Sequence, residues 1–329
     1  VAIHPGYGFL SEREAFAEAL TQNRIVFIGP NAKAIAAMGD KLEAKRRAVA
    51  AGVPTLPSSE DPSAAGDVGF PLLVKAAAGG GGRGMRLVEA ADDLPTALSS
   101  ARSEAENAFG SGELILEKAV RRPRHVEIQV FGDGRGRAVH LGERDCSLQR
   151  RHQKVVEIAP APNLDSSVRD ALCEAAVAIG REVNYENVGT VEFLVDADTN
   201  KFYFIEVNPR IQVEHTVTEQ ITGLDLVKSQ IRIAAGGRIG DIGSSGIPAQ
   251  EDIAMRGAAI QCRVTTEDPR NSFIPDYGHI VAYRSPAGPG VRLDAGTAYS
   301  GAVIGRHYDS LLVKITASGV SETEAADRM

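Results

Sequence analysis

Polar side chains occupy every second position at the end of one stretch of this sequence, residues 201–215, which reads KFYFIEVNPRIQVEH. Successive side chains of an extended chain point to opposite sides, so these polar residues would share one face. Carboxylate and amide oxygens bind hard metal ions, and carboxylates also accept protons. This face is therefore a candidate for chemistry rather than for packing. The residues are Glu206, Asn208, Arg210, Gln212 and Glu214.

Two glutamates face each other in the predicted hairpin, residues 189–208, that leads into this stretch. With the turn near Thr199, antiparallel pairing sets 196 opposite 202, 194 opposite 204, and Glu192 opposite Glu206. Like charges directly opposite each other are destabilising, but Mg²⁺ or Mn²⁺ would neutralise them, with Asn208 as a further oxygen ligand. Pairing with an Arg or Lys and a register slip remain alternatives. The other face would be apolar throughout: Val191, Phe193, Val195, Tyr203, Ile205 and Val207.

A glycine-rich loop, GGGGRG, lies between two predicted strands at 79–84. It satisfies G-x-G-x-x-G, but no helix follows, as a dinucleotide site requires, and no Gly-Lys-Ser/Thr follows, as a P-loop requires. Its N–H groups could close over phosphate oxygens, and a simple hairpin turn is the alternative. Lys75, in the preceding strand, is costly to bury without an anion. The flap, the lysine and the carboxylate pair together predict a site for ATP and metal.

The composition excludes several classes of protein. With 329 residues, 43% of them hydrophobic and 24% charged, the chain is long enough for about two globular domains. A net charge of −7 disfavours nucleic acid as a partner. No apolar run of about 18 residues and no signal segment is present, so we predict a cytoplasmic protein with no membrane partner. Cys146, Cys173 and Cys262 form no Cys-x-x-Cys pair, which argues against a disulfide framework and a zinc site.

The elements that must position these residues follow an α+β order. A β-α-β unit of a parallel sheet opens the chain, and helices follow up to Gly52. A compact unit of strands and one helix surrounds the glycine loop. From about residue 124 onward, alternating strands predict antiparallel pairing, interrupted by helices. The chain starts at Val1 and stops within a predicted helix, as expected of a fragment of a longer protein.

Six motifs, in their order and spacing, resemble the biotin carboxylase component of biotin-dependent carboxylases. They are HPGYGFLSE, MGDK, KAAAGGGGRGMR, PRHVEIQV, ERDCSLQRRHQKVVE and FIEVNPRIQVEH. The resemblance covers essentially the whole chain. Within the family, the later motifs HTVTE, IQCRVTTEDP, FIPDYG, AYRSPAG and AYSGAVI look most similar to the pyruvate carboxylase branch.

The resemblance implies an ATP-grasp fold, in which two α+β lobes clamp ATP. Residues 1–38 would be the remnant of an N-terminal, Rossmann-like pre-ATP-grasp domain. Residues 39–236 would form the ATP-grasp domain, with a mobile lid at about 60–119. Residues 250–329 would form a truncated biotin carboxylase C-terminal domain.

The resemblance also implies roles for individual residues. Glu192, Glu206 and Asn208 would hold the metal, in agreement with the hairpin. The residues that would contact ATP are Lys41, Lys75, Gly81, Gly82, Glu117, Lys118, Ala119, Val120, His125, Gln149 and His152. Those that would bind bicarbonate are Lys154, Arg210, Gln212 and Val213. Glu214 would be the general base, and Arg263 would bind biotin and stabilise its enolate.

The implied reaction is ATP- and bicarbonate-dependent carboxylation of biotin through carboxyphosphate. In the pyruvate carboxylase branch, carrier and carboxyltransferase domains outside this sequence would then convert pyruvate to oxaloacetate, within a homo-oligomer. Alternatives are an acetyl-CoA or propionyl-CoA carboxylase, or another bicarbonate-using ATP-grasp ligase such as carbamoyl phosphate synthetase, which has a serine-rich segment after NPR. A noncatalytic nucleotide-binding module would lack the catalytic side chains, all of which are present here.

Overall fold

The computed structural model of this chain describes residues 1–77, 85–151, 153–286, 288–296, 298–307 and 309–329. Gly81 and Gly82 of the predicted flap, and His152, lie outside the described residues. Helices and sheets both contribute to the fold, which confirms the predicted α+β class. Within the described ranges, no helix combines the length and the apolar character needed to cross a membrane.

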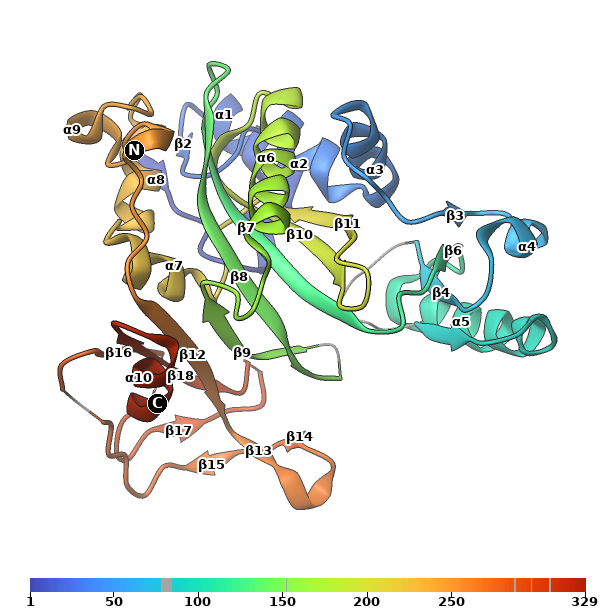
Figure 1. The fold of residues 1–329 in the computed structure, drawn as a ribbon. Helices are drawn as coiled ribbons and strands as arrows, with labels where there is room; N and C mark the ends of the chain where they lie inside the picture. Colours follow the sequence, from blue (N-terminus) through green and yellow to red (C-terminus); the bar gives the residue numbers. More distant parts are fainter. Residues whose placement is uncertain (78–84, 152, 287, 297, 308) are drawn as a thin grey trace.

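A long antiparallel sheet forms the body of the molecule (Figure 1). Its strand order is β11-β10-β7-β8-β9-β12-β18-β16, and each neighbouring pair runs antiparallel. The strands are β7 (Pro123–Asp133), β8 (Ala138–Arg150), β9 (Gln153–Ala159), β10 (Glu186–Asp196), β11 (Phe202–Asn208), β12 (Ala258–Thr265), β16 (Val291–Ala295) and β18 (Leu311–Gly319). Helices α7 (His215–Thr222) and α8 (Leu226–Ala234) pack against it.

Helix α6 (Ser166–Glu182) covers one face of β7 and β10 and leaves the other face free for chemistry. Its N-cap Asp165 accepts a hydrogen bond from the backbone N–H of Ser167 at 2.8 Å. Its apolar side chains join the main core with one face of the two strands, including Val126, Ile128, Val191 and Phe193. Because strand side chains alternate, the intervening polar side chains of β7 and β10 point to the opposite face.

A smaller sheet lies to one side of the long sheet, in the teal and blue part of Figure 1. Its order is β3-β6-β4-β5, and helix α5 (Leu94–Phe109) covers it. The strands are β3 (Ser58–Ser59), β4 (Leu72–Ala76), β5 (Arg86–Val88) and β6 (Leu114–Lys118), with the short α4 (Ala65–Val68) beside them. Its separate core includes Leu72, Val74 and Leu116. The unit corresponds to the region predicted as the lid, whose boundaries stay a prediction.

The two ends of the chain flank the long sheet. At the N-terminus, β1 (Ala2–Ile3) and β2 (Val26–Phe27) pair in parallel, which confirms the predicted β-α-β unit. The helices of this region are α1 (Glu14–Gln22), α2 (Ala32–Gly39) and α3 (Lys41–Ala50). Toward the C-terminus lie α9 (Ile242–Ser245), β13 (Glu267–Asp268), β14 (Ile274–Pro275), β15 (Gly278–His279), β17 (Val303–Ile304) and α10 (Glu322–Arg328).

The hairpin of β10 and β11 is partly as predicted. Glu192 does lie opposite Glu206, but residue 194 pairs with 203 and residue 195 with 202, because the register shifts between Glu192 and Phe193. Ile205 is the extra residue of a β-bulge, and in a bulge two successive side chains can point to the same side. The apolar face predicted for this strand is therefore wrong at Tyr203 and Ile205, which do not belong to the core, whereas Val207 does. Phe204 lies in the core, whereas Ile205 lines the cleft described next.

Candidate active site

A cleft of about 2080 Å³ is lined by side chains from both sheets and from the C-terminal strands. It brings together predicted site residues that are up to 222 positions apart, from Lys41 to Arg263. Those that line it are Lys41, Lys75, Glu117, Ala119, Val120, His125, Gln149, Lys154, Glu192, Glu206, Asn208, Arg210, Gln212, Val213, Glu214 and Arg263. Lys118 is not among them, because its amine turns away to the carbonyl oxygen of Phe70. The glycines of the flap and His152 are not described.

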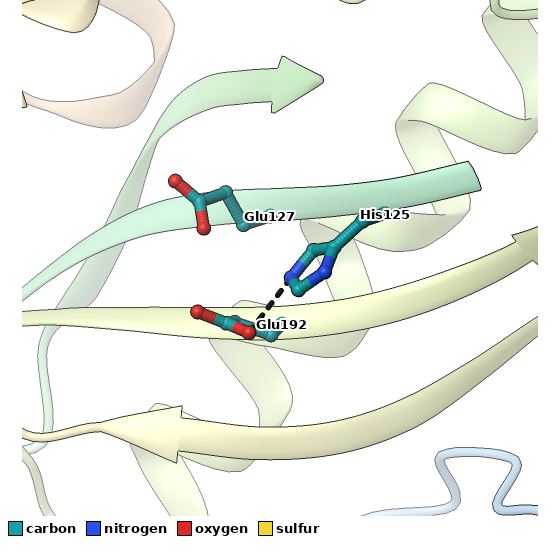
Figure 2. Close-up of side chains that lie close together, drawn as sticks. All are labelled: His125, Glu127 and Glu192. Atoms are coloured by element: carbon teal, nitrogen blue, oxygen red, sulfur yellow. Dashed lines mark ion pairs between the residues drawn. The ribbon is translucent and has the colours of Figure 1, made fainter. Parts of the chain in front are cut away.

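The ammonium group of Lys154, on β9, lies among three carboxylates. It donates hydrogen bonds to Glu127, to Glu192 at 2.8 Å and to Glu214 at 2.8 Å. Figure 2 shows His125 and Glu127 on β7 and Glu192 on β10, with the ring of His125 directed at Glu192. The His125 Nε2 to Glu192 Oε2 distance is 2.7 Å. Pairing with a lysine, the alternative to a metal left open above, is thus realised for Glu192.

The electrostatics of this cluster are set by the competition between burial and ion pairing. Burial opposes charge on Lys154, but Glu127, Glu192 and Glu214 outweigh it and hold the lysine pKa well above its usual value. Burial likewise raises the pKa of Glu214, but Lys154 and Arg263 outweigh it and lower that pKa to about 2. Glu214 is therefore ionised at neutral pH and free of a proton, as a general base must be.

Arg144, on β8, is a functional candidate that the sequence reasoning missed. Its guanidinium is fully buried and donates to Glu127 at 2.6 Å and to Gln212 at 3.0 Å. It thereby fixes both a carboxylate that binds Lys154 and an amide expected to bind bicarbonate. A signal existed: His125, Glu127 and Gln129 alternate along β7 as the polar residues of 201–215 do.

The two arginines expected to face bicarbonate and biotin are also paired with carboxylates. Arg210 Nε lies 3.1 Å from Glu12 Oε1, and its Nη2 donates to Asn208 Oδ1 at 3.1 Å. Arg263 Nη2 lies 3.1 Å from Glu214 Oε2. An incoming anion must therefore displace these carboxylates before it can bind the arginines.

The predicted metal ligands fit a hard divalent cation. Burial, and then the charge of Glu192, raise the pKa of Glu206, while the charges of Lys41 and Lys154 act in the opposite direction. Burial also opposes ionisation of Glu192, but Lys154 and His125 outweigh it and hold its pKa well below the usual value. Asn208 donates Nδ2 to Glu192 at 2.9 Å. Two buried carboxylates beside a side-chain amide oxygen form the kind of donor set that Mg²⁺ and Mn²⁺ prefer.

We expect Glu206→Gln in the complete enzyme to raise the metal concentration needed for half-maximal ATP cleavage by about 10-fold or more, because a carboxylate ligand is lost. Titration of Mg²⁺ at fixed ATP measures this. Glu113→Gln, an exposed glutamate that does not line the cleft, is the control. An unchanged titration curve would count against the assignment.

The nucleotide end of the cleft has its own ion pairs. Lys75, on β4, is paired with Glu117 on β6, so its half-buried charge already has an anion as partner. Lys45 lies 3.6 Å from the same carboxylate and donates to the carbonyl oxygen of Leu56. Gln149 donates to His125 Nδ1 at 3.0 Å, which joins two residues predicted to lie near the ribose or adenine.

Comparisons with known proteins identify the family. Residues 40–242 match the sequence model described as carbamoyl-phosphate synthase L chain, ATP binding domain. Residues 1–35 match biotin carboxylase, N-terminal domain, and residues 261–329 match biotin carboxylase C-terminal domain. The two flanking matches distinguish a biotin carboxylase from a carbamoyl phosphate synthetase, the other bicarbonate-using ligase considered above. The chain belongs to the biotin carboxylase family. Its ATP-grasp fold and the resemblance read from the sequence motifs are thereby confirmed.

Individual relatives support this. The biotin carboxylase domain of Hydrogenobacter thermophilus 2-oxoglutarate carboxylase, a dimer in complex with MgADP, ADP and bicarbonate, superimposes with a TM-score of 0.93 at 46% identity, covering 100% of this chain and 72% of that one. Rhizobium etli pyruvate carboxylase superimposes with a TM-score of 0.94 at 54% identity, covering 100% of this chain and 29% of that one. Bacillus subtilis pyruvate carboxylase is 52% identical over 100% of the chain, which spans 29% of that relative. Some other relatives are named as mitochondrial pyruvate carboxylases.

Proposed function

We propose that this biotin carboxylase domain uses ATP to carboxylate biotin with bicarbonate, as the first half-reaction of a pyruvate carboxylase. The observation that carries the proposal is the convergence of Lys154, Arg210, Glu214 and Arg263 in one cleft, with Lys41 and Lys75 in its lining. Two cations paired with a buried, ionised carboxylate, and a third cation in the same cleft, suit an anionic substrate that must also lose a proton. Lysines in the same cleft suit phosphates.

In the first step, bicarbonate would lie against Lys154 and Arg210 and take Lys154 away from Glu214. Loss of that cation would raise the pKa of Glu214, which makes it a better proton acceptor. Deprotonated bicarbonate would attack the γ-phosphorus, so that ADP leaves and carboxyphosphate forms. Glu192, Glu206 and Asn208 would hold the divalent metal ion, which supplies charge stabilisation at the phosphates.

In the second step, carboxyphosphate would break down to carbon dioxide and phosphate. The phosphate would accept the proton from the ureido nitrogen of biotin, and this nitrogen would bond to the carbon of carbon dioxide. Arg263 would hold the negative charge that develops on the ureido group. The carboxyl group would then pass through carrier and carboxyltransferase domains of a homo-oligomer to pyruvate.

Free biotin should stimulate bicarbonate-dependent ATP hydrolysis by the complete enzyme, because the acceptor draws off carboxyphosphate. ADP release, measured with and without bicarbonate and biotin, checks this. The control is the same assay without bicarbonate, in which biotin should have no effect. ATP hydrolysis that responds to ammonia or glutamine and not to biotin would favour a carbamoyl phosphate synthetase instead.

The final acceptor is the second part of the proposal. Pyruvate is favoured by whole-chain identities of 52% and 53% to the Bacillus subtilis and human pyruvate carboxylases. Comparing pyruvate, 2-oxoglutarate, acetyl-CoA and propionyl-CoA as acceptors for the complete enzyme tests it. The compartment is proposed as cytoplasmic, and location of the complete protein in mitochondria would overturn that.

A further inference from the structure

Glu157 has no part in the reaction as described so far, yet it is bound directly to the site. It lies on β9, its side chain is fully buried, and it does not line the cleft. Its Oε1 accepts a hydrogen bond from Arg263 Nε at 2.8 Å and lies 2.6 Å from Arg263 Nη2. Two nitrogens of one guanidinium, Nε and Nη2, thus share a single carboxylate oxygen, which holds this edge of the arginine against Glu157.

Arg263 therefore lies between two carboxylates with different surroundings. On one side Glu157 is enclosed in the sheet, and on the other Glu214 lines the cleft, with Arg263 Nη2 at 3.1 Å from Glu214 Oε2. An anion that enters the cleft can displace only the contact with Glu214. The contact with Glu157 would remain, and it would keep the arginine in place while its outer nitrogen changes partner.

Glu157 is itself held by a chain of buried polar groups. Its Oε2 accepts a hydrogen bond from Gln261 Nε2 at 2.7 Å, and Gln261 lies directly opposite it on β12. Thr216 of α7 donates to Gln261 and lies 2.8 Å from Thr316 on β18. The chain connects three strands of the long sheet with the helix that begins after Glu214, so the carboxylate has little freedom to move.

We propose that Glu157 is a positioning residue for biotin carboxylation, which holds Arg263 in the orientation needed to bind the ureido group of biotin. This rests on the function proposed above. Removal of its charge would let the guanidinium turn away from the place of the ureido group. The step that needs Arg263 would then be slowed, whereas the step at the phosphates would not.

The charges around Glu157 add a dependence on pH. Burial raises its pKa to about 7, with Arg263 acting in the opposite direction and Glu214 in the same one. Arg263 stays charged, since its two carboxylates outweigh burial and raise its pKa. Glu214, with its pKa of about 2, stays ionised. Burial raises the pKa of the nearby thiols of Cys146 and Cys262, so both stay neutral. Among these groups, Glu157 is the one that changes charge near neutrality.

The test uses the complete enzyme with free biotin as the probe and measures two rates, ATP cleavage with bicarbonate alone and its stimulation by biotin. Glu157→Gln should lower kcat/KM for biotin by about 10- to 100-fold, as a displaced positioning group does, with the rate without biotin and the KM for ATP unchanged. The wild-type rate with biotin should rise with pH through about 7, because Glu157 ionises there. The variant should stay at the low level across that range.

Glu143→Gln is the matched control. Glu143 is also a buried glutamate bound to an arginine, Arg169 at 2.6 Å, but neither residue lines the cleft. It should leave both rates and the pH profile unchanged. If Glu157→Gln fails to fold, Glu157→Asp keeps the charge and shortens the reach, and it should lower kcat/KM for biotin while keeping the rise with pH.

Combination with Arg263→Lys separates positioning from a general effect. Since Glu157 would act through Arg263, the loss in the double variant should be about that of Arg263→Lys alone. Additive losses, or wild-type biotin stimulation in Glu157→Gln, would overturn the positioning role. If the wild-type enzyme shows no biotin stimulation, the proposed function itself fails, which is a different result.

Discussion

Glu214→Ala in the complete enzyme should lower bicarbonate-dependent ATP cleavage by about 10²- to 10⁴-fold, the usual contribution of a general base. Glu214 is buried against Lys154 and Arg263, and its pKa of about 2 keeps it without a proton at neutral pH. The variant loses the proton acceptor and leaves both cations short of a partner. ADP release in the presence of saturating ATP and bicarbonate measures the loss.

Glu214→Gln separates the two causes. It keeps the shape and one acceptor oxygen but cannot take a proton, so it should be about as inactive as the alanine variant. Glu219→Gln, on the helix α7 that begins directly after Glu214, is the control, and its carboxylate is paired with Arg292 instead. It should retain activity. Turnover like that of the wild type in either Glu214 variant would rule out the general base.

Lys154→Met should destabilise the protein strongly and in a pH-dependent way. Removing one partner of a buried ion pair typically costs about 3–5 kcal/mol, because an uncompensated charge is left behind. Here Glu127, Glu192 and Glu214 would all lose their shared cation. Thermal unfolding of wild type and variant at about pH 7 and pH 5.5 measures the effect.

The direction of the pH effect follows from the carboxylates. In the wild type, Lys154 lowers the pKa values of Glu192 and Glu214 below 4.5, so the stability they contribute is present above pH 4.5. It is lost only as the pH falls toward those lowered values. Without the lysine, burial would dominate and raise both pKa values, and protonation would then relieve the repulsion. The gap in unfolding midpoint between the two proteins should therefore shrink at the lower pH.

Lys314→Met is the control for this experiment. Lys314 is also buried, but it donates to the carbonyl oxygen of Val213 at 2.8 Å, and within the described ranges it forms no ion pair with a carboxylate. Its loss should lower the unfolding midpoint by a similar amount at both pH values. If the difference in unfolding midpoint between the wild type and Lys154→Met is also the same at both pH values, the role assigned to the three carboxylates is refuted.

The sequence predicted the facing glutamates and most of the cleft lining because alternation in strands is a strong local signal. Glu192 and Glu206 are only 14 positions apart, and a hairpin brings them together almost regardless of the rest of the fold. The family motifs supplied the more distant members, such as Lys41 and Arg263.

The alternation along β7 marks the face on which Glu127 lies, but which cation it pairs with could not be predicted in the same way. Glu127, Arg144 and Glu157 lie on three different strands, and a polar residue in a strand looks the same in sequence whether it faces water or a buried cation. The pairing of Lys75 with Glu117 likewise depends on two neighbouring strands joined only in three dimensions. The register shift after Glu192 was missed because one extra residue in a strand leaves no mark in its composition.

The bulge at Ile205 has a consequence for how the chain tolerates changes in length. Phe202 and Phe204 pack into the core, whereas Glu206 and Asn208 line the cleft, although all four have the same parity. The bulge reverses the alternation of side chains, so the even-numbered residues face the core before it and the cleft after it. Loss of Ile205 would restore regular pairing and leave both sets on their present faces. Loss of Val207 would instead move Asn208 toward the core, so two neighbouring deletions of the same size would have opposite outcomes.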